Sequence, residues 1–332
     1  MRRTVSAVST LALALALAAC SPQPAGDAAG QPAEAAEQAQ DESQRLNAWF
    51  EAQYEELLKF SPTQLTFLGR KELNDQLDDM SEAAIRKRLA WLEASVKEME
   101  STFDHDKLDP EAQLSWELWK RQYESMRDGM PFLANGYLFD QMSGMHSSAP
   151  TFLINFHKVE DEKDYLAYVS RLQKLPVLFD QLLERARASA TQGIRPPKFA
   201  YEGVLDQSRK VVTGAPFGAG ADSALWADAQ AKADALVEKG AITAERAAEL
   251  KEQARKALLE QVQPAYARII AWCEEELPKA AENASGVGAT QANGADYYAY
   301  QLREMTTTGM NAEEIHQLGL SEVARIRGEM EA

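Results

Sequence analysis

The four histidines of this chain are the side chains best suited to bind a metal ion or to exchange protons near neutral pH. They are His105, His146, His157 and His316. No two of them are four residues apart, so the pair of helical ligands that is typical of a hydrolytic zinc centre is absent. Because such a centre typically needs three protein ligands and an open position for water, the sequence predicts no metal ligand and no catalytic residue.

A serine nucleophile is the next candidate chemistry. His146 directly precedes Ser147 and Ser148, and a serine becomes reactive only beside a base. Neighbouring residues on a loop rarely point at one another, however, and no GxSxG turn is present to expose a serine. Serine catalysis is therefore not expected.

The last histidine lies in the best specified helix of the chain. Asn311 and Glu314 form a capping-box pattern, and apolar residues recur at helical spacing over residues 315–330. On that helix Glu313 precedes His316 by three residues, so both side chains share a face and the carboxylate could orient the imidazole toward a substrate. A surface or interhelical hydrogen bond is the other interpretation of this pair.

Residues just before this helix are candidates for the wall of a cleft. Tyr297 and Tyr298 belong to a helical run, and Thr307 lies in a threonine-rich segment that ends in glycine. Such a segment is poor helix interior, so the pattern predicts a helix, a polar turn and a second helix. The candidate cleft-lining residues are therefore Tyr297, Tyr298, Thr307, Glu313 and His316, with a simple polar turn as the alternative for the threonine.

Most of the chain shows helical periodicity. Apolar residues recur at helical spacing over residues 46–58, 85–99, 116–130, 165–186 and 243–277. Ser81 and Asp109 stand where helix N-caps are expected, and Pro176 should kink or split the helix that contains it. Alanine, leucine and glutamate are abundant, and β-branched runs are scarce. The sequence predicts an all-α fold, a multi-helix array of long amphipathic helices with little or no sheet.

The N-terminus reads as a targeting segment. Arg2 and Arg3 precede a short apolar run, which is typical of a signal peptide over residues 1–19. Residues 17–20, LAAC, resemble the bacterial lipobox, in which Cys20 becomes the lipidated first residue and anchors the protein to a membrane. The alternative is an ordinary signal peptide cleaved after Ala19, with Cys20 as a free thiol. Ser21, where inner-membrane proteins carry aspartate, favours the outer membrane of the bacterial cell envelope, facing the periplasm.

Composition divides the mature chain into a tether and a helical domain. Residues 20–43 are rich in alanine, proline, glycine, glutamine and acids, and cannot bury enough apolar area to fold, so we expect a disordered tether. The helical domain is expected over residues 44–332. With Cys20 lipidated, Cys273 has no disulfide partner and is interpreted as a small core residue. The formal charge of -16 argues against nucleic acid as a partner.

Several motifs in order resemble one bacterial family, called domain of unknown function 885. The end of the chain carries YY, TTT and EEIHQLG followed by EVARI and EM, and upstream motifs are FSPTQLTFLG, DYLAYVSRLQKLP and GIRPPKFAYEGVLDQ. The resemblance spans residues 44–332. It implies a mostly helical, zinc carboxypeptidase-like lipoprotein of about twice this length, whose HExxPGHH-type zinc helix lies well beyond the EEIHQLG helix.

That zinc motif is absent from this sequence, which leaves two hypotheses. In the first, the chain is the non-metal-binding N-terminal part of a peptidase-like lipoprotein, truncated here. It would shape a cleft for peptides, remain inactive alone, and meet zinc only if a longer chain supplies the motif. In the second, it is a non-catalytic helical binding or scaffold lipoprotein. A truncated helical half would also expose an apolar surface, which predicts self-association.

Overall fold

A computed structural model describes the backbone of residues 31–332 and the side chains of residues 41–332. The all-α prediction is confirmed, since the described residues form helices and no strand, with one isolated bridge between Ala215 and Asp222. The elements are α1 (Gln31–Leu58), α2 (Pro62–Phe67), α3 (Glu82–Thr102), η1 (His105–Lys107), α4 (Pro110–Gly129), η2 (Met130–Phe132), α5 (Met145–Asn155), α6 (Glu162–Thr191), α7 (Lys198–Val211), α8 (Ala224–Glu238), α9 (Ala244–Ala257), η3 (Leu258–Val262), α10 (Gln263–Glu276), η4 (Leu277–Lys279), α11 (Val287–Thr290), α12 (Gly294–Thr306) and α13 (Ala312–Glu331).

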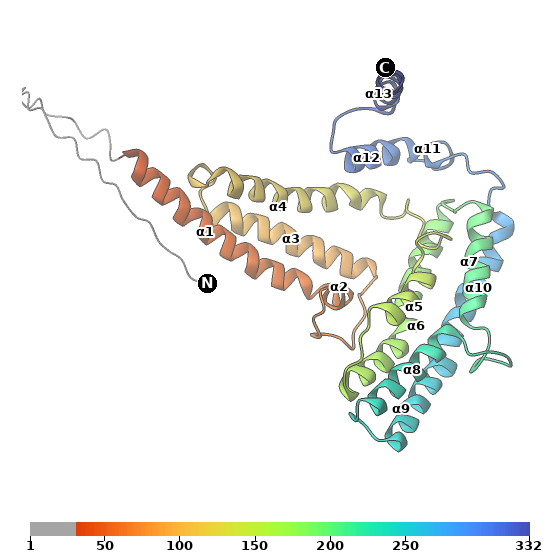
Figure 1. Cartoon of the computed structure of the whole chain (residues 1–332). Helices are drawn as coiled ribbons and strands as arrows, with labels where there is room; N and C mark the ends of the chain where they lie inside the picture. Colours follow the sequence, from red (N-terminus) through yellow and green to blue (C-terminus); the bar gives the residue numbers. More distant parts are fainter. Residues whose placement is uncertain (1–30) are drawn as a thin grey trace, which may run out of the picture.

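The helices form two packed groups that meet near α2. Figure 1 shows α1, α3 and α4 side by side in one group and α5 to α10 in the other. Each group has its own buried apolar cluster. Because the two clusters are separate, the first group depends on a small core, in which Phe103, Trp116 and Trp119 are the aromatic residues.

The small core confirms the interpretation of the aromatic stripes as packing surfaces. Trp116 and Trp119 of α4 are buried, and the indole N–H of Trp119 donates to the hydroxyl of Ser95 at 3.1 Å. Both predicted caps are present: Ser81 accepts from an amide of the first turn of α3, and Asp109 accepts from two amides of α4. These caps satisfy amides that a helix cannot pair internally and fix where α3 and α4 begin.

Helix α6 runs through the centre of the larger group and buries a long apolar face. It continues through Pro176, so of the predicted kink or split at that residue the split does not occur; burial of both flanking turns outweighs the hydrogen bond that proline removes. Before Pro264, the chain instead forms the π-helical segment η3, a geometry that often accompanies a bend. The larger group is therefore built around one continuous central helix, α6.

Helical backbone begins before residue 44, where the helical domain is expected to start. Helix α1 starts at Gln31, and Ser43 is buried where its hydroxyl accepts from the amide of Asp109 at 2.9 Å. Composition alone missed this contact because a polar residue can be buried when it caps a neighbouring element. The predicted signal peptide and Cys20 lie outside the described residues.

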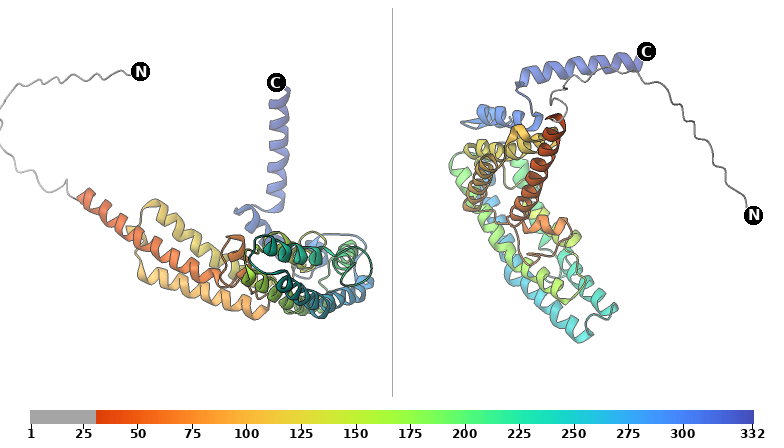
Figure 2. Two further views of the ribbon diagram at one scale, coloured as in Figure 1. Left: turned by 60° about the horizontal axis from the view of Figure 1, so that its bottom comes forward. Right: turned by 90° about the vertical axis from the view of Figure 1, so that its left-hand side faces the viewer.

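The last two helices and the turn between them form the predicted succession of helix, polar turn and helix. Asn311 and Glu314 make both bonds of the capping box at the start of α13. Helix α12 packs against α4, whereas α13 projects away from the body and has no buried residue (Figure 2). In the described residues, no helix has the length and apolar character needed to cross a bilayer.

Candidate functional site

The predicted cleft residues lead to a groove between α4 and α12. This groove, the α4–α12 groove, has a volume of about 840 Å³, and α3 and η2 complete its walls. Both apolar and polar side chains line it, among them Leu118, Gln122, Met126, Met130, Tyr300 and Thr307. A surface of this mixed character can receive an extended chain that offers both apolar side chains and backbone polar groups.

Hydrogen bonds and an ion pair join α12 to α4 and fix one wall of the groove. A carboxylate oxygen of Glu304 lies 2.5 Å from a guanidinium nitrogen of Arg121, and the hydroxyl of Ser125 also donates to Glu304. The phenol of Tyr300 donates to the carbonyl of Ser125 at 3.2 Å. A Cβ at Gly129 would lie 2.6 Å from the Tyr300 oxygen, so a residue without a side chain is needed there.

Burial changes the chemistry of the tyrosine in this contact. Desolvation raises the pKa of the Tyr300 phenol, and the nearby charge of Glu304 raises it further. The phenol is therefore neutral at physiological pH and acts as a hydrogen-bond donor. The carboxylate that accepts from the hydroxyl of Ser125 is also ion-paired with Arg121, so we interpret this contact as one that holds α12 on α4, and the groove is suited to binding and orienting a ligand.

The structure separates the predicted cleft residues. Thr307 lines the α4–α12 groove and forms the left-handed end of α12, with φ 55°. Tyr297 packs its ring against Phe132, with ring centroids 5.7 Å apart. Tyr298 is 47% exposed and does not line the groove.

Glu313 and His316 do not form the predicted pair. The carboxylate of Glu313 accepts from the side-chain amide of Gln317 at 2.8 Å, and His316 is exposed on α13. Because α13 projects from the body, these two residues do not line the α4–α12 groove.

Sequence reasoning missed the residues that build the groove. They are Tyr300 and Glu304 on α12 and Arg121 on α4. Helical spacing offered a signal, since Tyr297, Tyr300 and Glu304 recur at three and four residues and so share one face. The partner Arg121 lies 183 residues away in sequence, and nothing in the local pattern points to it.

The histidines do not fit a zinc site in the part of the chain that the structure describes. His146 is buried against Gln207, with 2.7 Å between ring nitrogen and amide oxygen, whereas His157 is buried against Arg171. His105 packs on the ring of Trp116. No group of three or more His, Cys, Asp or Glu side chains converges as metal ligands among these residues, so we derive no step through a metal.

The segment around His146 is helical, where the sequence indicated a loop. Residues 145–155 form α5 because Ala149, Phe152 and Leu153 are buried in the larger core, which outweighs weak helix propensity. The hydroxyls of Ser147 and Ser148 both donate to the carbonyl of Gly144, so neither is paired with the imidazole.

Cys273 is the core residue that the sequence predicted. Its side chain is fully buried, and burial raises the pKa of the thiol to about 12. A thiol that stays protonated at physiological pH is a poor nucleophile and a poor metal ligand.

Comparison with known proteins places this fold in a family. The model of a bacterial protein family of unknown function, domain of unknown function 885, matches residues 62–332. The chain belongs to this family. No curated protein matches it.

Two solved structures share the fold. A candidate lipoprotein from Colwellia psychrerythraea is 22% identical with a TM-score of 0.71, and the match covers 87% of this chain and 50% of that one. A second candidate lipoprotein, of unknown function, from Shewanella oneidensis is 19% identical with a TM-score of 0.59, and the match covers 87% of this chain and 46% of that one. This member of the family thus spans about half the length of the solved relatives that it matches.

Proposed function

We propose that this chain is the helical, non-metal-binding part of a peptidase-like lipoprotein of the cell envelope. In this proposal the α4–α12 groove contacts a peptide, and any zinc-dependent chemistry resides in a segment that these residues do not contain. Membership of the family and a match to half of each solved relative support the proposal.

The observation that carries the proposal is the uncovered face of α13. The helix has a complete capping box, so its local start is strongly specified. Its apolar residues Leu318, Val323, Ile326 and Met330 are nevertheless 45–81% exposed. Most helical stability in proteins comes from burial of an amphipathic face, so this face is suited to packing against a further segment or another molecule.

The same face supports self-association of the chain. Burying a leucine or isoleucine side chain is worth roughly 1.5–3 kcal/mol, so two such faces packed together gain from each residue that they cover. Self-association would then compete with docking of α13 onto the remainder of a longer protein.

Membrane anchoring through lipid on Cys20 completes the proposal. The LAAC sequence motivates it, and the two solved relatives are candidate lipoproteins by their descriptions. Facing the periplasm from the outer membrane is the location that Ser21 favours. Mass spectrometry of membrane extracts should detect a lipid-modified Cys20 terminus, and an unmodified terminus would contradict the anchor.

Peptide hydrolysis with the purified chain tests the assignment. Short peptides should not be cleaved by this chain, with or without added Zn²⁺, because its described residues provide no ligand set. Zinc-restored, chelator-sensitive hydrolysis would refute the proposal. A product of the same gene that carries an HExxPGHH-type helix should supply the missing activity, and loss of that activity on changing its histidines provides the matched control.

A further inference from the structure

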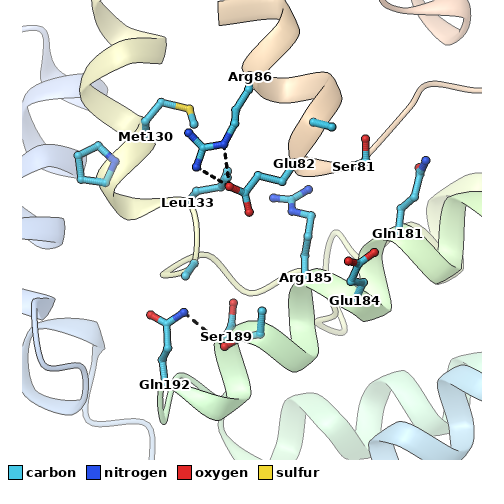
Figure 3. A pocket seen from close by; sticks show the side chains of 14 residues that line it. Ser81, Glu82, Arg86, Met130, Leu133, Gln181, Glu184, Arg185, Ser189 and Gln192 are labelled. Carbon is cyan, nitrogen blue, oxygen red and sulfur yellow. Dashed lines mark hydrogen bonds and ion pairs between the residues drawn. The ribbon is translucent and has the colours of Figure 1, made fainter.

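A second cleft lies between the start of α3 and the end of α6 (Figure 3). It shares Met130 and Leu133 with the α4–α12 groove, but its polar residues are different. We call it the α3–α6 cleft, after its lining residues Ser81, Arg86, Met130, Leu133, Arg185 and Ser189. Its volume is about 530 Å³. That volume lies within the roughly 300–1,000 Å³ that is usual for small-molecule sites.

Arg185 is a partly buried cation without a carboxylate partner in the described structure. Its guanidinium makes one protein hydrogen bond, from Nη1 to the carbonyl of Met80 at 3.0 Å. Burial lowers the pKa of this guanidinium, and only the nearby charge of Glu82 acts in the other direction. Most of the N–H donors of Arg185 are therefore available, and burial has removed water from them that no protein acceptor replaces.

Another arginine on the same helix shows what a purely structural arginine looks like. Arg171 is fully buried, and each of its three side-chain nitrogens has a protein partner, with carbonyl, amide, hydroxyl and imidazole groups among them. A guanidinium carries five N–H donors, and five contacts are made there. Arg185 makes only one such contact among the described residues, so a structural role does not account for its remaining N–H donors.

A second polar group faces the same cleft from one turn further along α6. Ser189 is only 6% exposed, and its hydroxyl has no hydrogen-bond partner among the described residues. Residues four apart on a helix share a face, so Arg185 and Ser189 both line the cleft, with the guanidinium of Arg185 extending toward α3 (Figure 3). Gln181 on the same face is already occupied, since its oxygen accepts from the amide of Met80 and its nitrogen donates to Asp79.

The other charged residues of the cleft are Glu82, Arg86 and Glu184. Figure 3 shows Glu82 bonded to Arg86 at the start of α3, with 2.9 Å between a carboxylate oxygen and Nε of Arg86. Glu184 is exposed at the rim. The α3 helix also directs the positive end of its dipole toward this region, because Ser81 is its N-cap. Because Glu82 is paired with Arg86, a ligand carboxylate in this cleft would meet Arg185 as the cation without an ion-pair partner among the described residues.

We propose that the α3–α6 cleft binds a small ligand through a carboxylate, with the guanidinium of Arg185 as a two-donor clamp and Ser189 as a third donor. The apolar part of the ligand lies against Met130 and Leu133. Planar guanidinium matches planar carboxylate in geometry, and charge-assisted bonds of this kind are strong. The ligand chemistry is that of a small N-acylated amino acid or the C-terminal residue of a peptide. This site is independent of the proposed peptidase assignment.

Titration of the full chain with N-acetylalanine, trialanine and the neutral N-acetylalaninamide tests the site. Calorimetry should detect the two acids and not the amide. Arg185→Gln should weaken acid binding about tenfold or more, as expected for loss of a charge-assisted pair, and Ser189→Ala should weaken it less. Arg185→Lys keeps the charge without the fork and should fall between the wild type and Arg185→Gln. If only trialanine binds, the site selects peptide termini; if both acids bind, a free carboxylate suffices.

Arg187→Gln is the matched control, because Arg187 is exposed on the same helix and does not line the cleft. It should bind the acids as the wild type does. Equal binding of acid and amide, equal effects of the two arginine substitutions, or no binding of either acid at about 10 mM would overturn the proposal. Thermal unfolding of each variant separates loss of the site from loss of the fold.

Discussion

Replacing Arg171 by methionine should destabilise the junction between the two helix groups. The side chain reaches from α6 to α2 and to the segment that follows it. Its Nε donates to the carbonyl of Gln76 at 2.8 Å, and one Nη1 contact reaches Nδ1 of His157 at 2.8 Å. Because the arginine is fully buried, water cannot replace these bonds when the guanidinium is removed.

The structure sets the size of the effect. Three acceptors in buried contacts lose their donor in Arg171→Met: the side-chain oxygen of Asn74, Nδ1 of His157 and the carbonyl of Pro62. Each unsatisfied acceptor costs roughly 1–3 kcal/mol. Removing a desolvated cation recovers part of that cost, so we expect a loss of about 3–5 kcal/mol in the free energy of unfolding.

Urea unfolding followed by far-UV circular dichroism measures this loss. Arg187→Met is the control, because Arg187 lies on the same helix and is exposed. It should change stability by less than about 0.5 kcal/mol. A loss below about 1 kcal/mol in Arg171→Met would refute the reasoning, since the three acceptors would then be satisfied without the arginine.

Three further predictions concern pH, the groove and α13. Burial lowers the pKa of His157 to about 4 from its ordinary 6.5, so the unfolded chain binds this proton first, and about 3 kcal/mol of stability should be lost as the pH falls from 6.5 to 4. A His157→Gln variant with an unchanged pH dependence of urea unfolding would contradict this. Tyr300→Ala should speed amide hydrogen exchange in α12 without lowering the main unfolding transition, because Tyr300 bonds to α4. Tyr298→Ala is the control and should leave the exchange rate unchanged, since Tyr298 is exposed and has no such bond. Equal exchange rates in the two variants would count against the contact. A Leu318→Glu and Ile326→Glu double variant should run as a monomer in size exclusion and bind little hydrophobic dye, and a wild-type chain that already does both would reject self-association through α13.

The sequence predicted the helices well because helix caps and apolar periodicity depend only on neighbouring residues. Ser81 and Asp109 cap the helices that follow them, as the sequence indicates, and Asn311 with Glu314 forms the capping box. A cap bonds amides two or three residues away, so its effect needs no knowledge of the rest of the fold.

The candidate sites were harder to predict because their contacts are distant. The carboxylate of Glu304 meets Arg121 across 183 residues of sequence, and Ser43 meets Asp109 across 66. The α5 helix formed where its sequence indicated a loop, since burial of Phe152 in the larger core outweighs its propensity. Local periodicity contains none of this information.

The sequence by itself determined that this protein is helical, where many of its helices begin, and which family it resembles, since those properties depend on composition, period and neighbouring residues. The tertiary structure alone decided which polar groups are satisfied. Arg171 and Arg185 are the same residue type on the same helix, α6, and local sequence patterns do not predict which of them is surrounded by hydrogen-bond acceptors. Packing surrounds the first with acceptors and leaves the second with one, because hydrogen-bond partners are supplied by segments far away in the chain.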